Sequence, residues 1–114
     1  PRGSWKTTVP LPRYEKNIRV MVQLIRRIGA EVILMSPTLK NPGWEHTSGH
    51  INDYRKAMSR IASQEQVPFA DVTGAWLDLE KQGIPFMPYL STCINHPNDY
   101  GHRLIFNTLK TVFD

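Results

Sequence analysis

The sequence predicts an α/β fold built around a parallel β-sheet, and three observations support this prediction. The chain has 114 residues, 40% of them hydrophobic, which suits one small domain with a buried core. Helical and strand-like patterns alternate along it. The two strand-like stretches are short, apolar and rich in β-branched residues. This order is typical of a parallel sheet with helices on both faces and right-handed crossovers between its strands.

The first half of the chain is expected to contain a helix, a strand and a loop. A helix is expected over residues 13–28, with Gly29 as its stop, because apolar residues recur there at helical spacing. These apolar positions are Ile18, Met21, Val22, Ile25 and Ile28. Residues 31–35 form a strand that we expect to be buried on both faces and to end at residues 36–37. Residues 38–49 form a surface loop long enough to border a binding cleft.

The second half contains three more helices and a strand. Residues 52–66 form a helix, residues 67–72 form a strand, and a third helix follows and ends near Gly83. The last helix covers residues 99–113. The inward faces expected for the three helices are Tyr54, Ala57, Met58, Ile61 and Ala62; Val72, Ala75, Trp76 and Leu79; and Leu104, Ile105, Thr108, Leu109 and Val112.

Two parallel strands are too few for a sheet that is buried on both faces. We therefore expect further strands beside them, supplied either by a missing half of the sheet or by a partner chain. The chain then corresponds to the second half of a three-layer α/β domain, represented by about two strands and four helices.

Composition and charge exclude several classes of protein. The net charge is +4, but basic and acidic residues are interspersed, so we expect no nucleic-acid partner. The single cysteine, Cys93, has no internal disulfide partner, and no Cys or His spacing fits zinc, so no metal and no cofactor are expected. The longest apolar run, residues 32–35, is too short to span a membrane. Residues 1–4 look like the remnant of an expression tag, which leaves residues 5–114 as the domain.

Residues 95–102, with the sequence NHPNDYGH, are the stretch that most suggests chemistry. Pro97 fixes its own φ and biases His96 toward an extended backbone. Either Asn98 or Asp99 is then free to cap the last helix. His96 is therefore held in a stiff turn, where an imidazole can carry protons near neutral pH.

Four stretches resemble, in their order and spacing, the later part of the SGNH (GDSL-like) hydrolase family. They are residues 14–18 (YEKNI) at the first helix, residues 29–37 (GAEVILMSP) around the first strand, residues 67–72 at the second strand, and the histidine–proline turn at residues 96–102. The resemblance covers nearly the whole chain after the tag-like start.

This resemblance implies a flavodoxin-like, three-layer α/β/α fold and a serine esterase in which a histidine activates a serine hydroxyl. The family's Gly-Asp-Ser motif, glycine block and asparagine block precede the first strand seen here, and nothing in this sequence matches them. The chain is therefore expected to supply the catalytic histidine, His96, to lack the nucleophile and to be inactive alone. Its partners would be an ester substrate and the missing N-terminal half, or a second chain that completes the sheet.

The acid that would orient His96 is an open question. The family places an aspartate three residues before its histidine, and Cys93 occupies that position here. The alternatives are a dyad, a backbone carbonyl acceptor or a different acid. Asp99 is the nearest candidate, although capping of the last helix is its more ordinary role. For His102 we expect packing at the helix start against the preceding loop rather than catalysis.

Several other residues are candidates for a role at the site. Of the serines only Ser36 lies at a strand end, but a proline without an N–H follows it, which argues against a nucleophile. Trp44, in a polar loop, is a candidate substrate contact, whereas Trp76 is expected in the core. Asp71 is expected to cap the helix after the second strand. The alternative function is a non-catalytic α/β interaction module, or an inactive remnant, that pairs through its exposed strand edge.

Overall fold

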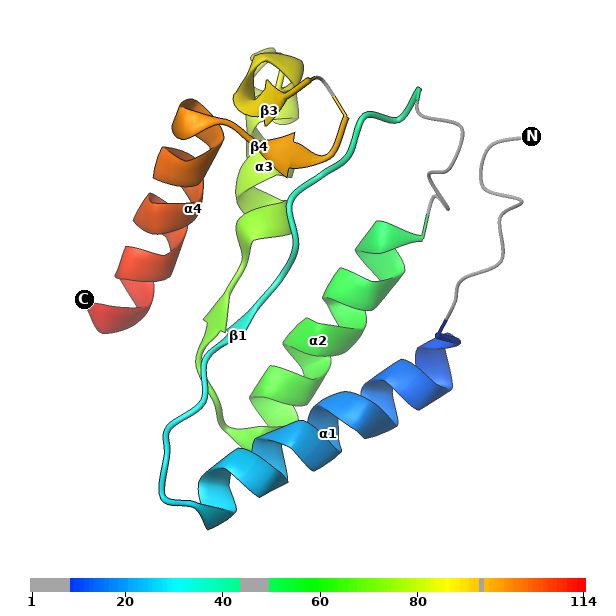
Figure 1. Cartoon of the computed structure of the whole chain (residues 1–114), viewed down its shortest axis with the longest axis vertical. Helices are drawn as coiled ribbons and strands as arrows, with labels where there is room; N and C mark the ends of the chain where they lie inside the picture. The colour runs from blue at the N-terminus through cyan, green and yellow to red at the C-terminus, as the bar shows by residue number, and fades with distance from the viewer. Residues whose placement is uncertain (1–8, 44–49, 93) are drawn as a thin grey trace.

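The structure is a computed structural model of the chain, and it describes residues 9–43, 50–92 and 94–114 (Figure 1). The expected tag remnant at residues 1–4 lies outside these residues. The elements are α1 (Leu11–Arg27), β1 (Leu34–Met35), α2 (Ile51–Glu65), β2 (Phe69–Ala70), α3 (Val72–Lys81), the 3₁₀ helix η1 (Met87–Tyr89), β3 (Leu90–Ser91), β4 (His96–Pro97), α4 (Asp99–Lys110) and the 3₁₀ helix η2 (Thr111–Phe113). The four expected helices are all present, close to their expected bounds.

The two expected strands pair in parallel, which confirms the central prediction for the sheet. Their expected bounds are wrong, because each strand has only two residues and Val72 belongs to α3. Leu34 of β1 lies opposite Phe69 of β2, and the next residues pair in the same register. The Leu34 N–H donates to the carbonyl oxygen of Pro68 at 3.0 Å. Figure 1 shows the α1–α2 pair on one side of these strands and α4 on the other. The α/β class is therefore confirmed, while the flavodoxin-like, three-layer arrangement of a complete domain stays a prediction.

The helices α1 and α2 pack against the strands through one apolar cluster. Its buried members are Ile18, Val22, Val32, Met58, Ile61, Ala62 and Val67. At its edge the rings of Tyr14 and Tyr54 meet edge to face, with 4.8 Å between their centroids. Arg60 of α2 forms an ion pair with Glu15 of α1. The inward face expected for α2 is confirmed, because its four central residues are buried and Tyr54 is partly buried.

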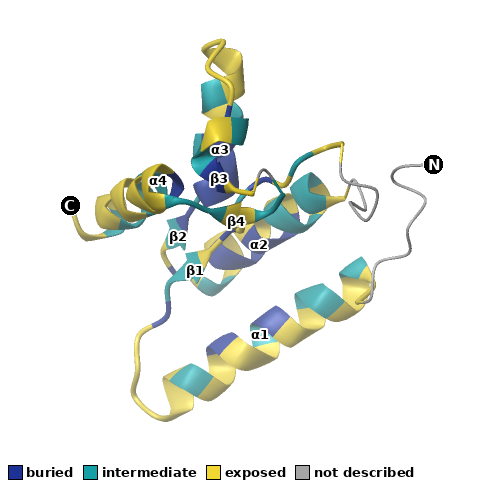
Figure 2. Cartoon of the chain, turned by 45° about the horizontal axis from the view of Figure 1, so that its top comes forward, coloured by how far each residue is buried: buried dark blue, intermediate teal, exposed yellow. Residues whose placement is uncertain are grey.

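The burial expected for α1 and β1 is wrong in part, because both elements are covered on one side only. Met21 and Ile28 of α1 are 49% and 81% exposed, and Met35 of β1 is 45% exposed. Figure 2 shows that most of the surface of α1 is exposed. The strand β1 is therefore not buried on both faces, although its periodicity is that of a buried strand.

A second apolar cluster surrounds Trp76. Its buried members are Leu39, Val72, Trp76, Phe86 and Leu90. Trp76 is fully buried, which confirms its expected place in the core. The ring of Tyr89 meets the Trp76 ring edge to face, 6.4 Å between centroids, and Leu104 and Ile105 of α4 pack against the same cluster. This cluster therefore joins α3 and α4 to the segment between them.

The sequence does not predict the short antiparallel hairpin of β3 and β4 that precedes α4. Leu90 lies opposite Pro97, and Ser91 lies opposite His96. Thr92 begins the connection between the strands with a φ of 57°, in the left-handed region. Strands of two residues are too short to produce a recognisable alternation of apolar and polar side chains.

The helix α4 approaches this hairpin closely at Gly101. A Cβ atom at this buried residue would lie 2.8 Å from the Cβ of Pro97 and 3.3 Å from the ring of Trp76, and it would collide with the carbonyl oxygen of Tyr89. The position therefore requires glycine, and its small size seats the first turn of α4 against both Trp76 and the strand that carries His96.

We predict that Gly101→Ala lowers the free energy of unfolding by about 1–3 kcal/mol, because the added methyl group overpacks this contact. Urea denaturation measures the change. The matched control is Arg103→Ala, at an exposed position in the same helix, which should shift the free energy by less than about 0.5 kcal/mol. Equal stability of the two variants would contradict the close approach.

Candidate active site

His96 points away from the core because side chains alternate along β4. Successive residues of a strand face opposite sides. Leu90 is 4% exposed and lies opposite Pro97, so this pair faces the core. Ser91 and His96, the next pair, face outward and are exposed. The expectation that His96 has an extended backbone before Pro97 is confirmed.

Asn98 fastens the segment that bears His96. Its backbone N–H donates to the Tyr89 carbonyl oxygen at 3.0 Å, and its Nδ2 donates to the Pro88 carbonyl oxygen at 2.5 Å. Its Oδ1 accepts from the Gly101 N–H at 3.1 Å and caps α4. The capping role considered for Asp99 is therefore wrong, because Asn98 has the extended backbone of a cap and Asp99 already lies in the first helical turn.

The hairpin is also tied to the chain that leaves β1. The Asn41 N–H donates to the Ile94 carbonyl oxygen at 2.7 Å, and the Thr38 hydroxyl donates to the Asn95 carbonyl oxygen at 3.5 Å. The strand β4, which carries His96, therefore lies beyond the carboxyl ends of the parallel strands, in the upper part of Figure 1. In open α/β sheets ligands bind outside these ends.

The residues His96, Asp99 and Ser91 are all exposed. Neither the His96 imidazole nor the Asp99 carboxylate makes a hydrogen bond or ion pair with the described residues, and both side chains are exposed. Ser91 is the cross-strand neighbour of His96, and such neighbours have Cβ atoms about 5 Å apart. His102 is exposed too, so its expected packing against the preceding loop is wrong. Sequence reasoning missed the Ser91–His96 pairing because it missed the hairpin.

Ser36 and Asp71, at the carboxyl ends of β1 and β2, belong to a structural network. Ser36 is fully buried, and its Oγ accepts from the Thr73 N–H at 2.9 Å and donates to Asp71 Oδ1 at 3.1 Å. Asp71 Oδ1 also accepts from the Gly74 N–H at 3.0 Å, which confirms that Asp71 caps α3. A serine held in this way has no access to a substrate, in agreement with the expectation for Ser36.

Arg55 of α2 completes this network and sets its charge balance. Its Nε donates to Asp71 Oδ1 at 2.9 Å and its Nη2 to Oδ2 at 2.5 Å. These hydrogen bonds hold the pKa of the Asp71 carboxyl below its ordinary value, against the opposing effect of partial burial. The same pair raises the pKa of Arg55. Asp71 is therefore an ionised structural carboxylate rather than a proton carrier.

The remaining sequence-based candidates do not extend the site. Trp44, the expected substrate contact, and Cys93 lie outside the described residues. Within the described ranges no three His, Cys, Asp or Glu side chains gather as a metal site. No helix of the described chain is long and apolar enough to cross a membrane.

Comparison with known proteins identifies the family of the chain. The model of the GDSL-like Lipase/Acylhydrolase family matches residues 5–104. The chain belongs to this family, and the resemblance seen in its sequence is confirmed.

A curated relative and two solved structures define the extent of the similarity. The chain is 25% identical over 120 residues to the isoamyl acetate-hydrolyzing esterase of Saccharomyces cerevisiae, covering 94% of this chain and 49% of the yeast protein. The structure of an acetylxylan esterase from Geobacillus stearothermophilus is 21% identical with a TM-score of 0.72, covering 90% of this chain and 47% of the esterase. An α/β hydrolase from the metagenome of Lake Arreo, Spain, is 24% identical with a TM-score of 0.71, covering 91% and 47%. The chain thus spans about half the length of the relatives it matches.

We predict that Asp71→Asn lowers the free energy of unfolding at pH 7 by on the order of 1 kcal/mol, a value limited by solvent screening of a partly exposed ion pair. The folded pKa of Asp71 lies below the unfolded value of about 3.9. The carboxylate therefore stabilises the fold above that pH, and this contribution is lost as the pH falls through the folded pKa.

Urea titrations at pH 7 and pH 3 measure the effect. The difference in the free energy of unfolding between wild type and Asp71→Asn should be smaller at pH 3. Glu80→Gln, which removes an exposed carboxylate from the same helix, is the control and should show little effect at either pH. If this difference in the free energy of unfolding stays constant with pH, the charge of Asp71 does not stabilise the fold.

Proposed function

We propose that this chain supplies the histidine-bearing part of a serine ester hydrolase. The observation that carries the proposal is the exposed His96 beyond the carboxyl ends of the parallel strands, fastened by Asn98 on one side and by the segment after β1 on the other. Membership of the GDSL-like family supports the same chemistry. A complete domain would have the flavodoxin-like, three-layer α/β/α arrangement.

In this reaction His96 acts as the general base and then as the general acid. It takes the proton from a serine hydroxyl as the oxygen attacks the ester carbonyl, and it returns the proton to the departing alkoxide. Water then releases the acyl group from the serine by the same route. No described serine hydroxyl forms a hydrogen bond with the His96 ring. The nucleophile and the oxyanion donors are therefore assigned to the part of the domain that this chain does not contain, and the chain alone is expected to be inactive.

The names of two relatives point to acetyl esters as the substrate class. The yeast relative is an isoamyl acetate-hydrolyzing esterase, and the Geobacillus structure is that of an acetylxylan esterase. Both names describe acetate esters with different alcohols, so we propose a small acyl group and leave the alcohol open. Trp44 is kept as the proposed substrate contact on the strength of its place in the loop after β1.

Two side chains are candidates for the group that orients the His96 ring. Asp99 is proposed as the carboxylate that accepts from the imidazole, since it lies three residues after His96 and its charge stabilises the imidazolium form. Ser91, across the hairpin, offers an uncharged hydroxyl instead. A carboxylate stabilises an imidazolium more strongly than a hydroxyl does.

We predict that His96→Ala lowers kcat for a chromogenic acetate ester by about 100-fold to 10,000-fold, the usual contribution of a positioned general base. The assay uses the complete polypeptide encoded by the reading frame that contains this chain. His102→Ala is the matched control, because it removes an exposed imidazole six residues away in the sequence. Equal rates for wild type and His96→Ala would remove the esterase assignment.

We further predict that Asp99→Asn lowers kcat more than Ser91→Ala does, with little change in KM for either variant. The values of kcat and KM are measured for both variants with a chromogenic acetate ester. Circular dichroism checks that each variant folds. A larger effect at Ser91 would assign the orienting role to the hairpin hydroxyl, and no effect at either position would indicate a backbone acceptor or a dyad.

A further inference from the structure

The hydrogen bonds of Asn98 serve two separate tasks. Its Oδ1 accepts from the Gly101 N–H at 3.1 Å and caps α4. Its Nδ2 donates to the Pro88 carbonyl oxygen at 2.5 Å, and its backbone N–H donates to the Tyr89 carbonyl oxygen at 3.0 Å. The first bond holds the start of the helix, whereas the other two join the residue after β4 to η1. A carboxamide side chain takes part in both tasks because it offers an acceptor and donors.

The segment that receives the Nδ2 bond is fixed in the core. Phe86, directly before η1, is buried in the same cluster as Trp76, and the ring of Tyr89 meets the Trp76 ring edge to face. The Tyr89 N–H donates to the Phe86 carbonyl oxygen at 2.9 Å and closes the turn around Pro88. The Pro88 carbonyl oxygen is therefore a fixed point, although Pro88 itself lies at the surface.

The Nδ2 bond takes the place of a backbone bond that the hairpin lacks. Two residues that face each other in a hydrogen-bonded antiparallel pair normally exchange two backbone bonds. The Asn98 N–H donates to the Tyr89 carbonyl oxygen, but the Tyr89 N–H donates to Phe86 within the turn of η1 instead of crossing to Asn98. The second bond at this position is therefore supplied by the Asn98 side chain, through Pro88.

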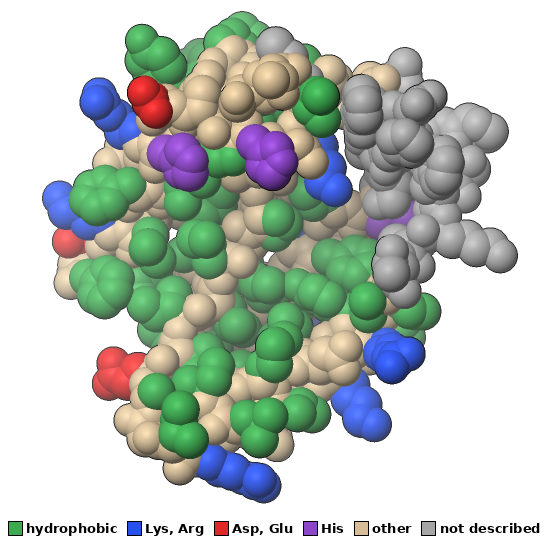
Figure 3. Space-filling view, in the orientation of Figure 1, with side chains coloured by type: hydrophobic (Ala, Val, Ile, Leu, Met, Phe, Trp, Pro, Cys, Tyr) green, Lys and Arg blue, Asp and Glu red, His purple; other side chains and the backbone are tan. Residues whose placement is uncertain are grey.

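Before His96 the chain is held less tightly. The Asn95 carbonyl oxygen accepts from the Thr38 hydroxyl at 3.5 Å, which is long for a hydrogen bond. The nearest short bond on this side, 2.7 Å from the Asn41 N–H, reaches only the Ile94 carbonyl oxygen. The imidazole forms no hydrogen bond with the described residues, and Figure 3 shows histidine side chains on the surface over the hairpin and the start of α4. Its position therefore depends mainly on the main chain that follows it.

We infer that Asn98 is a positioning residue for His96, and that its Nδ2 bond to Pro88, rather than its cap of α4, sets the position of the imidazole. This role rests on the proposed function only in taking His96 as the general base. A base must lie within hydrogen-bond reach of the proton that it takes, and a displacement of about 1 Å can cost about 100-fold in rate. Serine and aspartate cap a helix about as well as asparagine does, so capping alone does not require asparagine here.

The test uses three variants of the complete polypeptide encoded by the reading frame that contains this chain. Asn98→Asp and Asn98→Ser keep an acceptor for the Gly101 N–H but lose the donor to Pro88, and Asn98→Ala loses both. We expect all three to lower kcat for a chromogenic acetate ester by about 10-fold to 100-fold, with KM nearly unchanged. The urea midpoint should fall clearly only in Asn98→Ala, because only this variant loses the cap.

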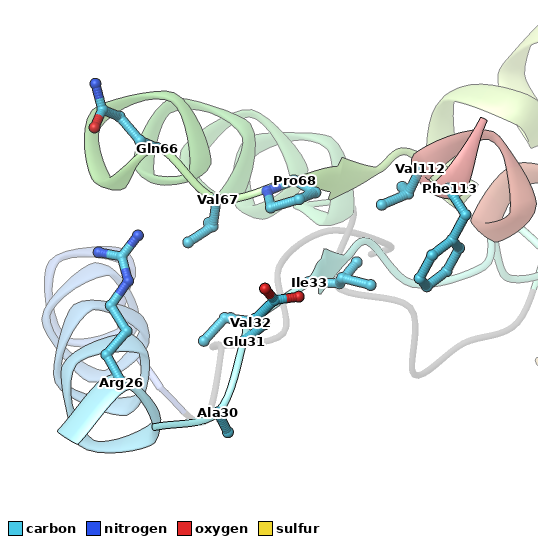
Figure 4. A pocket seen from close by; sticks show the side chains of 10 residues that line it. All are labelled: Arg26, Ala30, Glu31, Val32, Ile33, Gln66, Val67, Pro68, Val112 and Phe113. Carbon is cyan, nitrogen blue, oxygen red and sulfur yellow. The ribbon is translucent and has the colours of Figure 1, made fainter. Parts of the chain in front are cut away.

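Gln66→Glu is the matched control for the change from a carboxamide to a carboxylate. Figure 4 shows Gln66 beside a cavity of about 560 Å³ at the amino ends of the strands, whereas β4 lies beyond their carboxyl ends. This variant should have the kcat of wild type. Asn98→Ser separates positioning from charge, because serine is neutral. A loss of kcat in Asn98→Asp alone would show that a negative charge acts on His96, and it would overturn the inference.

Backbone amide exchange, measured by NMR on the same polypeptides, reports the two tasks without any use of activity. The N–H at position 98 bonds across the hairpin, and the Gly101 N–H bonds to the cap. In Asn98→Ser the protection factor at position 98 should fall by about tenfold or more, while that of Gly101 keeps its wild-type value. In Asn98→Ala both protection factors should fall.

Two further results would overturn the inference. One is wild-type kcat in both Asn98→Asp and Asn98→Ser, and the other is a loss of kcat that simply follows the fall of the urea midpoint across the three variants. Failure of the proposed function is a different result, because His96→Ala would then have the kcat of wild type. The protection factors alone would in that case decide whether the Nδ2 bond holds the strand that carries His96.

Discussion

The structure depends on the contacts of one carboxylate, Asp71, at the point where β2 ends. It receives a bidentate pair of hydrogen bonds from Arg55 of α2, one from the Ser36 hydroxyl at the end of β1, and one from the first turn of α3. Four elements, β1, α2, β2 and α3, therefore meet at this side chain. The start of α3 fixes where Trp76 lies, and Trp76 in turn limits how closely α4 approaches at Gly101. The position of the histidine hairpin follows from a charged contact in which the hairpin takes no part.

In the β3–β4 hairpin, the backbone at His96 is fixed although the imidazole makes no hydrogen bond with the described residues. Backbone and side-chain hydrogen bonds fix Asn98 and the segment after β1, while the His96 ring itself has no partner among the described residues. Under the proposed function, this positioning of the main chain would lower the entropic cost of bringing the imidazole to a substrate. A ring without a bound acceptor has an undefined tautomer, so the group that orients it decides its chemistry. Within two residues of β4, the side chain of Pro97 faces the core and that of His96 faces outward, so the backbone is held while the imidazole stays exposed.

Much of the fold follows from the sequence, and the failures have a common physical cause. The four helices and the parallel pair are predictable because long amphipathic periods and apolar β-branched runs are strong local signals. The exposure of Met21 and Ile28 is not, because periodicity tells which side of a helix is apolar but not what covers it. The β3–β4 hairpin has strands of two residues and rests on tertiary contacts at Gly101. Asn98 and Asp99 are equally good caps by residue type, and only the backbone conformation separates them.

The proposed function connects the outer edge of β1 with the exposed side chain of His96. A strand that runs parallel to β1 along its free edge would end at the same edge of the sheet as Ser36. The loop that follows such a strand would emerge beside residues 38–41, on which the His96 hairpin rests. Residues of that loop would then face the imidazole from across the carboxyl edge, where ligands of open α/β sheets bind. Under the proposed function, one segment would both cover this edge of β1 and face His96, so the packing of the sheet would also place the proposed nucleophile.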